Sequence, residues 1–275
     1  MTYTTLMVHL ELGQTNAGLL HIAGDLAERF HANVIGIAAC QSMPIAYGDT
    51  YVSGDILEQL RKESEKEIKK AEAEFRSALQ TRAETLEWRS TVTLGSLVNY
   101  VAHEARSADL IITKAIPREF LDNSRRLNIG EFVLHAGRPV LIVPGAADQL
   151  KLERVVVAWK DIREARRAVL DALPLLKKAD HVVVVEITAE EKLSGARMHL
   201  EDVVGWLKRH GIVAEALASS SIGDDATRLK AIVQEQGADL IVAGAYGHSR
   251  LRELVLGGMT GDLLLCADRC SLVSH

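Results

Sequence analysis

The stretch Ala238-Asp-Leu-Ile-Val-Ala-Gly244-Ala-Tyr-Gly247 is followed, after nine residues, by Gly257-Gly258-Met259-Thr260. Its apolar part predicts a buried strand that ends in a glycine-containing turn. Glycines let backbone N–H groups approach an anion closely, and a helix that opens near Gly257 directs its own free N–H groups the same way. The stretch therefore predicts a mononucleotide site at the end of a strand.

The chain contains an internal repeat. Ser107-Ala-Asp-Leu-Ile-Ile-Thr-Lys-Ala115 matches Gly237-Ala-Asp-Leu-Ile-Val-Ala-Gly-Ala245, with the two copies 130 residues apart. We therefore expect two related domains, 1–147 and 151–275, with the turn-rich segment 144–150 as the linker.

Apolar runs alternate with amphipathic segments in each half. Strands are expected at 5–10, 33–39, 86–94, 139–143, 154–159, 181–187, 213–219 and 271–274, besides the two repeated Ala-Asp-Leu-Ile segments. Helices are expected between them, including 55–81, 97–106, 193–210 and 226–236. This alternation predicts an α/β fold with two tandem doubly wound parallel-sheet domains. Each domain should have its crevice between its first and fourth strands, where the strand order reverses.

Composition excludes several classes of protein. The 275 residues are 48% hydrophobic and 25% charged, with a net charge of -5. An acidic balance argues against a nucleic-acid partner, and no apolar run approaches the length of a membrane span. Without a signal-like amino terminus, we expect a cytoplasmic protein. The three cysteines lack a metal-binding pattern and are interpreted as free thiols; Cys266 and Cys270 would share one helix face.

The Gly-x2-Gly-x9-Gly spacing, with the preceding Ala-Asp-Leu-Ile-Val and the intervening Arg250-Leu-Arg-Glu253, resembles the ATP-binding branch of the universal stress protein family. The resemblance implies ATP, ADP or AMP as the ligand, with Mg²⁺ as a possible companion. It implies that the ribose and phosphates are surrounded by Gly244, Gly247, Gly257, Gly258, Met259 and Thr260. Two positions depart from the family pattern: Gly258 replaces a serine, and Lys160 replaces an aspartate.

The ends of the first two strands of the second half supply further candidates by the same resemblance: Ala158, Lys160 and Ile187. Lys160 either contacts a phosphate, or it forms an ion pair with Asp161 or is exposed to solvent in a loop. Ile187 either contacts the adenine or belongs to the core, and Trp159 has the same two alternatives. Thr260 either caps its helix or contacts a phosphate.

The first half lacks the glycines that the second half has after its repeated strand. Lys114 stands where the repeat has Gly244, Pro117 stands where it has Gly247, and Glu131 lies near the position of Gly258. A proline removes an N–H donor and a carboxylate repels a second anion, so we interpret this half as degenerate. In the family such domains pair through edge strands, which implies an internal pseudo-twofold pair here. A further homodimer is left open.

No phosphate-loop lysine motif and no nucleophile triad is present in the sequence. We therefore expect a regulatory nucleotide sensor, in which occupancy orders the loop from Tyr246 to Leu256 for an unidentified protein partner. A nucleotide-free scaffold that binds a protein or an apolar small molecule is the alternative, and a weak ATP hydrolase is the third. Bulkier residues at Gly244 and Gly247 are expected to abolish binding with little loss of fold.

Overall fold

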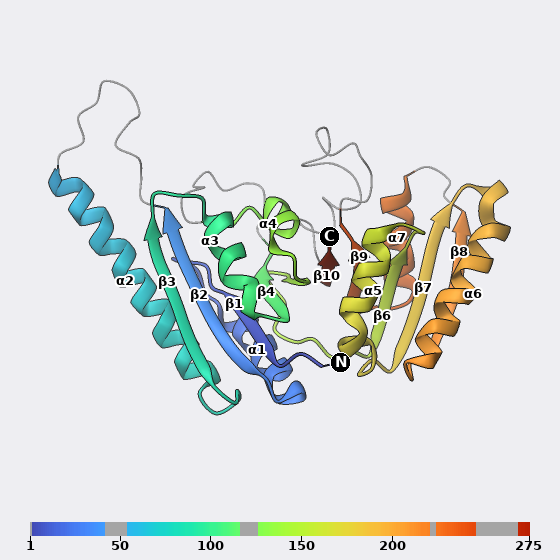
Figure 1. Cartoon of the computed structure of the whole chain (residues 1–275), viewed down its shortest axis with the longest axis horizontal. Coiled ribbons are helices and arrows are strands. Elements are labelled where there is room, and N and C mark those ends of the chain that lie inside the picture. The colour runs from blue at the N-terminus through green and yellow to red at the C-terminus, as the bar shows by residue number, and fades with distance from the viewer. Residues whose placement is uncertain (1, 42–53, 116–125, 221–223, 246–268) are drawn as a thin grey trace, which may run out of the picture.

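The computed structural model describes residues 2–41, 54–115, 126–220, 224–245 and 269–275. Within these ranges the strands form one ten-stranded sheet in the order β3-β2-β1-β4-β5-β10-β9-β6-β7-β8. Figure 1 shows the sheet running across the whole molecule, with the first half of the chain at one end and the second half at the other.

The first half contains the following described elements: β1 (Thr5–His9), α1 (Ala17–Phe30), β2 (Asn33–Gln41), α2 (Gly54–Leu79), β3 (Leu86–Thr93), α3 (Leu97–Glu104), η1 (Ala105–Ser107), β4 (Leu110–Lys114), α4 (Ile129–Ala136) and β5 (Val140–Val143). The five strands are parallel to one another, and β1 lies between β2 and β4.

The second half repeats this order with β6 (Arg154–Trp159), α5 (Arg163–Leu176), β7 (His181–Thr188), η3 (Glu190–Lys192), α6 (Leu193–Arg209), β8 (Ala214–Ser220), α7 (Asp225–Glu235), β9 (Leu240–Gly244) and β10 (Cys270–Ser274). Its strands are also parallel, with β6 between β7 and β9. The α/β fold expected from the sequence is confirmed, and the described strands begin and end within about two residues of their predicted limits.

Within the described residues, the strands of the two halves meet at the antiparallel pair β5 and β10. Leu272 of β10 lies opposite Leu141 of β5, and Val273 lies opposite Val140. The Tyr3 hydroxyl donates a hydrogen bond of 2.6 Å to the carbonyl oxygen of Asp171, which adds a polar link between the halves. The sheet is therefore continuous across the junction, and the edges that are left at its two ends are β3 and β8.

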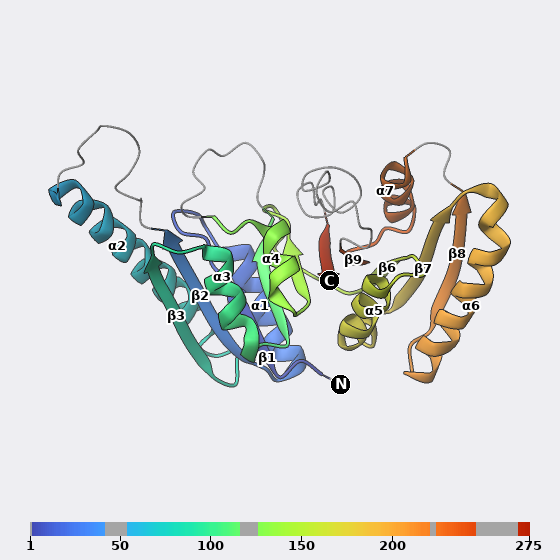
Figure 2. The same cartoon turned by 45° about the horizontal axis from the view of Figure 1, so that its top comes forward.

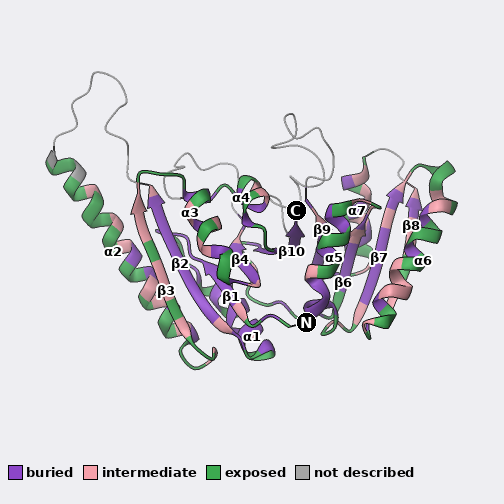
Figure 3. Ribbon diagram, in the orientation of Figure 1, coloured by how far each residue is buried: buried purple, intermediate pink, exposed green. Residues whose placement is uncertain are grey.

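Helices cover both faces of the sheet (Figure 2). Residues of α1, α2, α5 and α6 share one hydrophobic cluster that spans both halves. On the opposite face, α3 and α4 cover the first half and α7 covers the second, each over its own cluster. This arrangement follows from the nearly continuous apolar runs of the central strands, which are buried on both faces. Figure 3 shows the buried central strands and the partly exposed β3 and β8.

Candidate functional site

The strand order reverses at two places in the sheet, between β1 and β4 and between β6 and β9. A crossover leaves β1 toward β2, while β4 lies on its other side, and β6 has the same relation to β7 and β9. Ligands of open α/β sheets bind outside the carboxyl ends of the strands at such points. The two switch points are therefore the candidate sites, and their residues can be compared directly.

The strand register makes the two switch points equivalent residue by residue. Leu6 lies opposite Leu110, and Val155 lies opposite Leu240. Three residues further along, His9 and Thr113 in the first half correspond to Ala158 and Ala243 in the second. By the same register Glu11 corresponds to Lys160, and Lys114 corresponds to Gly244.

Two buried polar side chains lie at the first-half switch point. His9 Nδ1 lies 3.1 Å from Thr113 Oγ1, and the two side chains are 3% and 0% exposed. Burial lowers the pKa of His9 from 6.5 to about 4, so the ring is neutral in the folded chain at neutral pH. The hydrogen-bonded pair lies at the carboxyl ends of β1 and β4.

A buried carboxyl group, that of Glu11, follows His9 by two residues. Glu11 is buried, and its Oε1 atom has no hydrogen-bond partner among the described residues. Burial raises the pKa of Glu11, while the positive charges of Arg126 and Lys114 act in the opposite direction. A buried carboxylate at the strand end disfavours a bound anion. The first-half switch point therefore carries a buried carboxyl group, with the positive charges of Lys114 and Arg126 near it, where the second half has Lys160.

The second-half switch point lacks large side chains along its floor. Ala158 and Ala243 lie opposite each other on β6 and β9, where the first half has His9 and Thr113. Ala158 is partly exposed, whereas Ala243 is buried. The second half thus has two methyl groups at the positions where the first half has an imidazole ring and a hydroxyl group.

Gly244 is required by packing at the end of β9. A Cβ atom built at this position would lie 2.5 Å from the backbone nitrogen of Ala165 and 2.5 Å from the carbonyl carbon of Glu164. Real Cβ atoms do not approach backbone atoms this closely, so any larger residue must displace the start of α5. The expectation that a bulkier residue at Gly244 leaves the fold nearly unchanged is therefore wrong.

Lys160 follows β6 and points across to α7. Its Nζ lies 3.0 Å from Oδ2 of Asp225, in the first turn of α7. Asp161, the partner expected from its neighbouring position in the sequence, instead pairs with Arg166 at 2.8 Å. The prediction that Lys160 pairs with Asp161 is therefore wrong. The ammonium group of Lys160 does lie at the carboxyl end of β6. The Lys160 side chain is 42% exposed and so remains accessible.

Ile187 and Trp159 lie on opposite faces of the sheet. Ile187 is 4% exposed and belongs to the cluster beneath α7, together with Leu229 of that helix. Trp159 is buried in the cluster under α5 and α6, with Ala168 and Val169 of α5. Both side chains thus belong to the core, and Trp159 points away from the face that carries Ala158.

The remaining predicted nucleotide contacts, Gly247, Gly257, Gly258, Met259 and Thr260, lie outside the described residues, as do Cys266, Pro117 and the loop from Tyr246 to Leu256. Cys270 is described, and it begins strand β10. The interpretation that places Cys270 on a helix face is therefore wrong. Cys40 and Cys270 are both free and buried.

No group of three or more histidine, cysteine, aspartate or glutamate side chains in the described ranges is arranged to hold a metal ion. None of the helices there combines the length and apolar character needed to cross a membrane.

Sequence reasoning missed two features of the site. The His9–Thr113 pair was not foreseen, although aligning the first strands of the two halves would have set His9 against Ala158. The Lys160–Asp225 pair could not be foreseen, because 65 residues separate the partners and only the position of α7 brings them together.

No family model and no curated protein matches the chain. Solved structures do match it along nearly its whole length. A universal stress protein from Archaeoglobus fulgidus superposes with a TM-score of 0.74 at 16% identity, covering 98% of this chain and 97% of that one. A putative universal stress protein from Pseudomonas aeruginosa gives a TM-score of 0.63 at 14% identity, covering 99% of this chain and 93% of that one.

A functionally unknown protein from Pseudomonas aeruginosa gives a TM-score of 0.62 at 13% identity, and 99% of this chain covers 92% of that one. At these identities the likeness establishes the fold. The chain therefore has the universal stress protein fold at the length of two repeats.

Proposed function

We propose that the chain is a regulatory protein of the universal stress type that binds one adenine nucleotide, ATP, ADP or AMP, at the carboxyl ends of β6 and β9. One observation supports this most strongly. The second switch point has the small residues Ala158, Ala243 and Gly244, whereas the first half has the larger His9, Thr113 and Lys114 at the equivalent register positions.

The glycine-rich sequence adds to this support. Gly247, Gly257 and Gly258 follow β9 in the chain, together with Met259 and Thr260. Glycines in this spacing allow backbone N–H groups to approach phosphates, and the Thr260 hydroxyl is a further donor. Lys160 supplies a positive charge at the end of β6, where it can exchange Asp225 for a phosphate. Mg²⁺ would then be held mainly by the phosphates.

We assign this site to a second domain, 151–275, and interpret 1–147 as a degenerate copy that serves as its packing partner. The buried Glu11 and the His9–Thr113 pair support the assignment. The proposal therefore predicts one nucleotide per chain. The unidentified protein partner would respond to occupancy of that single site.

One observation favours the nucleotide-free scaffold as the alternative. The ammonium group of Lys160 already has a carboxylate partner, Asp225, so its positive charge does not require a bound phosphate. A slow ATP hydrolase is the third candidate, and catalysis of this kind needs a residue that positions water for attack on the phosphate.

Denaturing the protein as purified and identifying the released small molecules by mass spectrometry tests the proposal. Co-purified adenine nucleotide at up to one equivalent per chain supports it. Protein that is free of nucleotide and gains no thermal stability from added Mg-ATP supports the scaffold. Release of phosphate well beyond one equivalent supports the hydrolase.

A further inference from the structure

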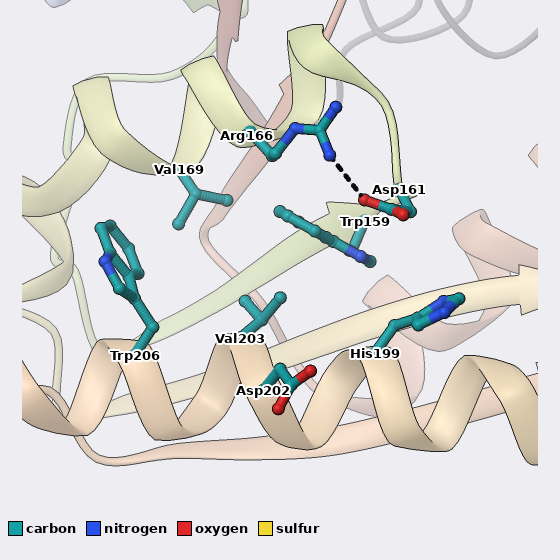
Figure 4. A pocket seen from close by; sticks show the side chains of 8 residues that line it. All are labelled: Trp159, Asp161, Arg166, Val169, His199, Asp202, Val203 and Trp206. Carbon is teal, nitrogen blue, oxygen red and sulfur yellow. Dashed lines mark hydrogen bonds and ion pairs between the residues drawn. The ribbon is translucent and has the colours of Figure 1, made fainter.

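A pocket of about 360 Å³ opens between α5 and α6, on the face of the sheet opposite to Ala158. Its apolar wall consists of Trp159, Val169, Val203 and Trp206. Figure 4 shows the indole of Trp159 between the two helices, with Val169 on one side and Val203 on the other. Volumes of this size and apolar walls of this kind are typical of small-molecule sites.

The equivalent helices of the first half are packed together. There α1 and α2 pack against each other, and the buried Phe75 and Leu79 of α2 belong to the core. In the second half, Val203 and Trp206 of α6 stay only partly buried, because they face the pocket. The indole of Trp206 is held in place by His210, whose ring centroid lies 4.4 Å away. The pocket thus has a preformed aromatic wall at one end.

Two polar atoms beside the pocket are buried without a partner among the described residues. They are Nε1 of Trp159, a donor, and Oε2 of Glu186, an acceptor. The two residues lie opposite each other in the β6–β7 register. Glu186 also lies on the pocket side of the sheet, since Val182 and Val184, which precede it by four and two residues, belong to the cluster under α5 and α6. Buried polar groups are normally satisfied, so the unpaired acceptor Oε2 of Glu186 indicates a ligand group that donates hydrogen bonds.

The charges around the pocket leave an excess of carboxylate. Asp161 is paired with Arg166, and Lys160 is paired with Asp225 on the other face. Asp202, on the pocket rim, makes no hydrogen bond or ion pair with the part of the chain that the structure describes. Burial raises the pKa of Glu186, with Asp161 acting in the same direction and His199 and Lys160 acting against it. A cationic ligand would complement Glu186 and Asp202.

We propose that this pocket binds a small aromatic molecule that carries a protonated amine. The ring lies against Trp206, Val169 and Val203, and the ammonium group approaches Glu186 and Asp202 near the indole of Trp159. Aromatic packing and cation–π attraction to tryptophan both favour this class of ligand. The site is separate from the switch point, so the proposal does not depend on nucleotide binding.

Three probes of similar shape test the role of charge in the full chain: 2-phenylethylamine, the neutral 2-phenylethanol and the anionic phenylacetate. Their affinities are compared by tryptophan fluorescence and by NMR of the indole N–H groups. We expect the amine to bind at least about tenfold more tightly than the other two. Saturating Mg-ATP should leave that affinity unchanged, which separates this pocket from the nucleotide site.

Substitutions of single residues around the pocket test whether the probes bind there. Glu186→Gln should remove the preference for the amine, and Trp206→Leu should weaken the binding of all three probes. Glu215→Gln, an exposed glutamate on the neighbouring β8, is the matched control and should leave all affinities unchanged. If Glu186→Gln does not fold, as judged by near-ultraviolet circular dichroism, the exposed Asp202→Asn carries the charge test. Equal affinity for the three probes, or no saturation by about 10 mM, would overturn the proposal.

Discussion

His9 Nδ1 lies 3.1 Å from Thr113 Oγ1, and this hydrogen bond joins the carboxyl ends of β1 and β4 at the first switch point. At the equivalent register positions of the second half, Ala158 lies opposite Ala243. The two halves share one fold, and they differ at the position where a ligand of this fold binds. This asymmetry is the basis for assigning a single nucleotide site to the second half.

Transferring the first-half histidine to the second half should close the proposed site. We expect Ala158→His to reduce the affinity for Mg-ATP by at least about tenfold, because an imidazole would occupy the space between β6 and β9. Calorimetric titration measures the loss, and Ala146→His, at an exposed linker position, is the control. Unchanged affinity in Ala158→His would show that the nucleotide does not use this crevice.

The Lys160–Asp225 pair gives two substitutions with opposite expected effects. Lys160→Met should weaken Mg-ATP binding, because it removes the positive charge that can meet a phosphate. Asp225→Asn should strengthen binding, since it frees Lys160 and removes a competing carboxylate. Lys160 is partly exposed, so loss of the pair should cost less than about 1 kcal/mol in the free energy of unfolding. If both variants bind like the parent protein, Lys160 is not a phosphate ligand.

Gly244→Ala should destabilise the fold by about 1–3 kcal/mol, because its Cβ would meet the backbone of Glu164 and Ala165 at the start of α5. Gly205→Ala in α6 is the matched control. A Cβ there would meet only the end of the flexible Arg209 side chain at 3.9 Å, so alanine should stabilise the helix by about 0.5–1 kcal/mol. Urea unfolding measures both changes. Equal effects at the two glycines would contradict the close packing at Gly244.

The buried His9 predicts a specific pH dependence of stability. Its pKa is about 4 in the folded chain, against 6.5 as the ordinary value. Between these values the unfolded chain binds a proton that the folded chain does not, so stability is lost as the pH falls below 6.5. The full loss from this group is about 3 kcal/mol, complete below pH 4.

In His9→Gln this contribution should be absent, so its unfolding free energy should fall less steeply between pH 7 and pH 4.5. Comparing urea unfolding of the two proteins across this range removes the contributions of the other titrating groups. Parallel pH profiles would contradict a buried, neutral His9.

Cys270 should be inert in the folded protein. Burial, with a smaller contribution from the charge of Asp239, raises the pKa of its thiol to about 12. The thiolate is the reactive form, so iodoacetamide at pH 8 should leave Cys270 unmodified until the chain unfolds. Peptide mass spectrometry of native and denatured samples makes the comparison. Rapid alkylation in the native sample would show that the start of β10 opens readily.

Much of the fold could be predicted from the sequence, because it depends on local patterns. The apolar runs at β6 and β7 and the repeated Ala-Asp-Leu-Ile segment identify strands that are buried on both faces. The position of each switch point then follows from the handedness of the crossovers.

The parts of the site that depend on distant packing could not be predicted. The role of Gly244 depends on how closely α5 approaches β9, and the partner of Lys160 depends on where α7 begins. The strand expected at 271–274 agrees with β10, and only its first residue, Cys270, differs from expectation, because the four-residue spacing of Cys266 and Cys270 suggests a shared helix face. The pocket between α5 and α6 arises from the separation of these two helices. The amino-acid sequences of the helices contain no signal that predicts this separation.

The central claim is that one switch point of the two is open to a nucleotide. Calorimetric titration of Mg-ATP into nucleotide-stripped protein tests it most directly, with His9→Ala/Thr113→Ala measured in parallel. The account predicts one site per chain in the parent protein and undiminished affinity for that site in the double variant. Two equal sites per chain, or no heat at several temperatures together with no thermal stabilisation, would contradict it.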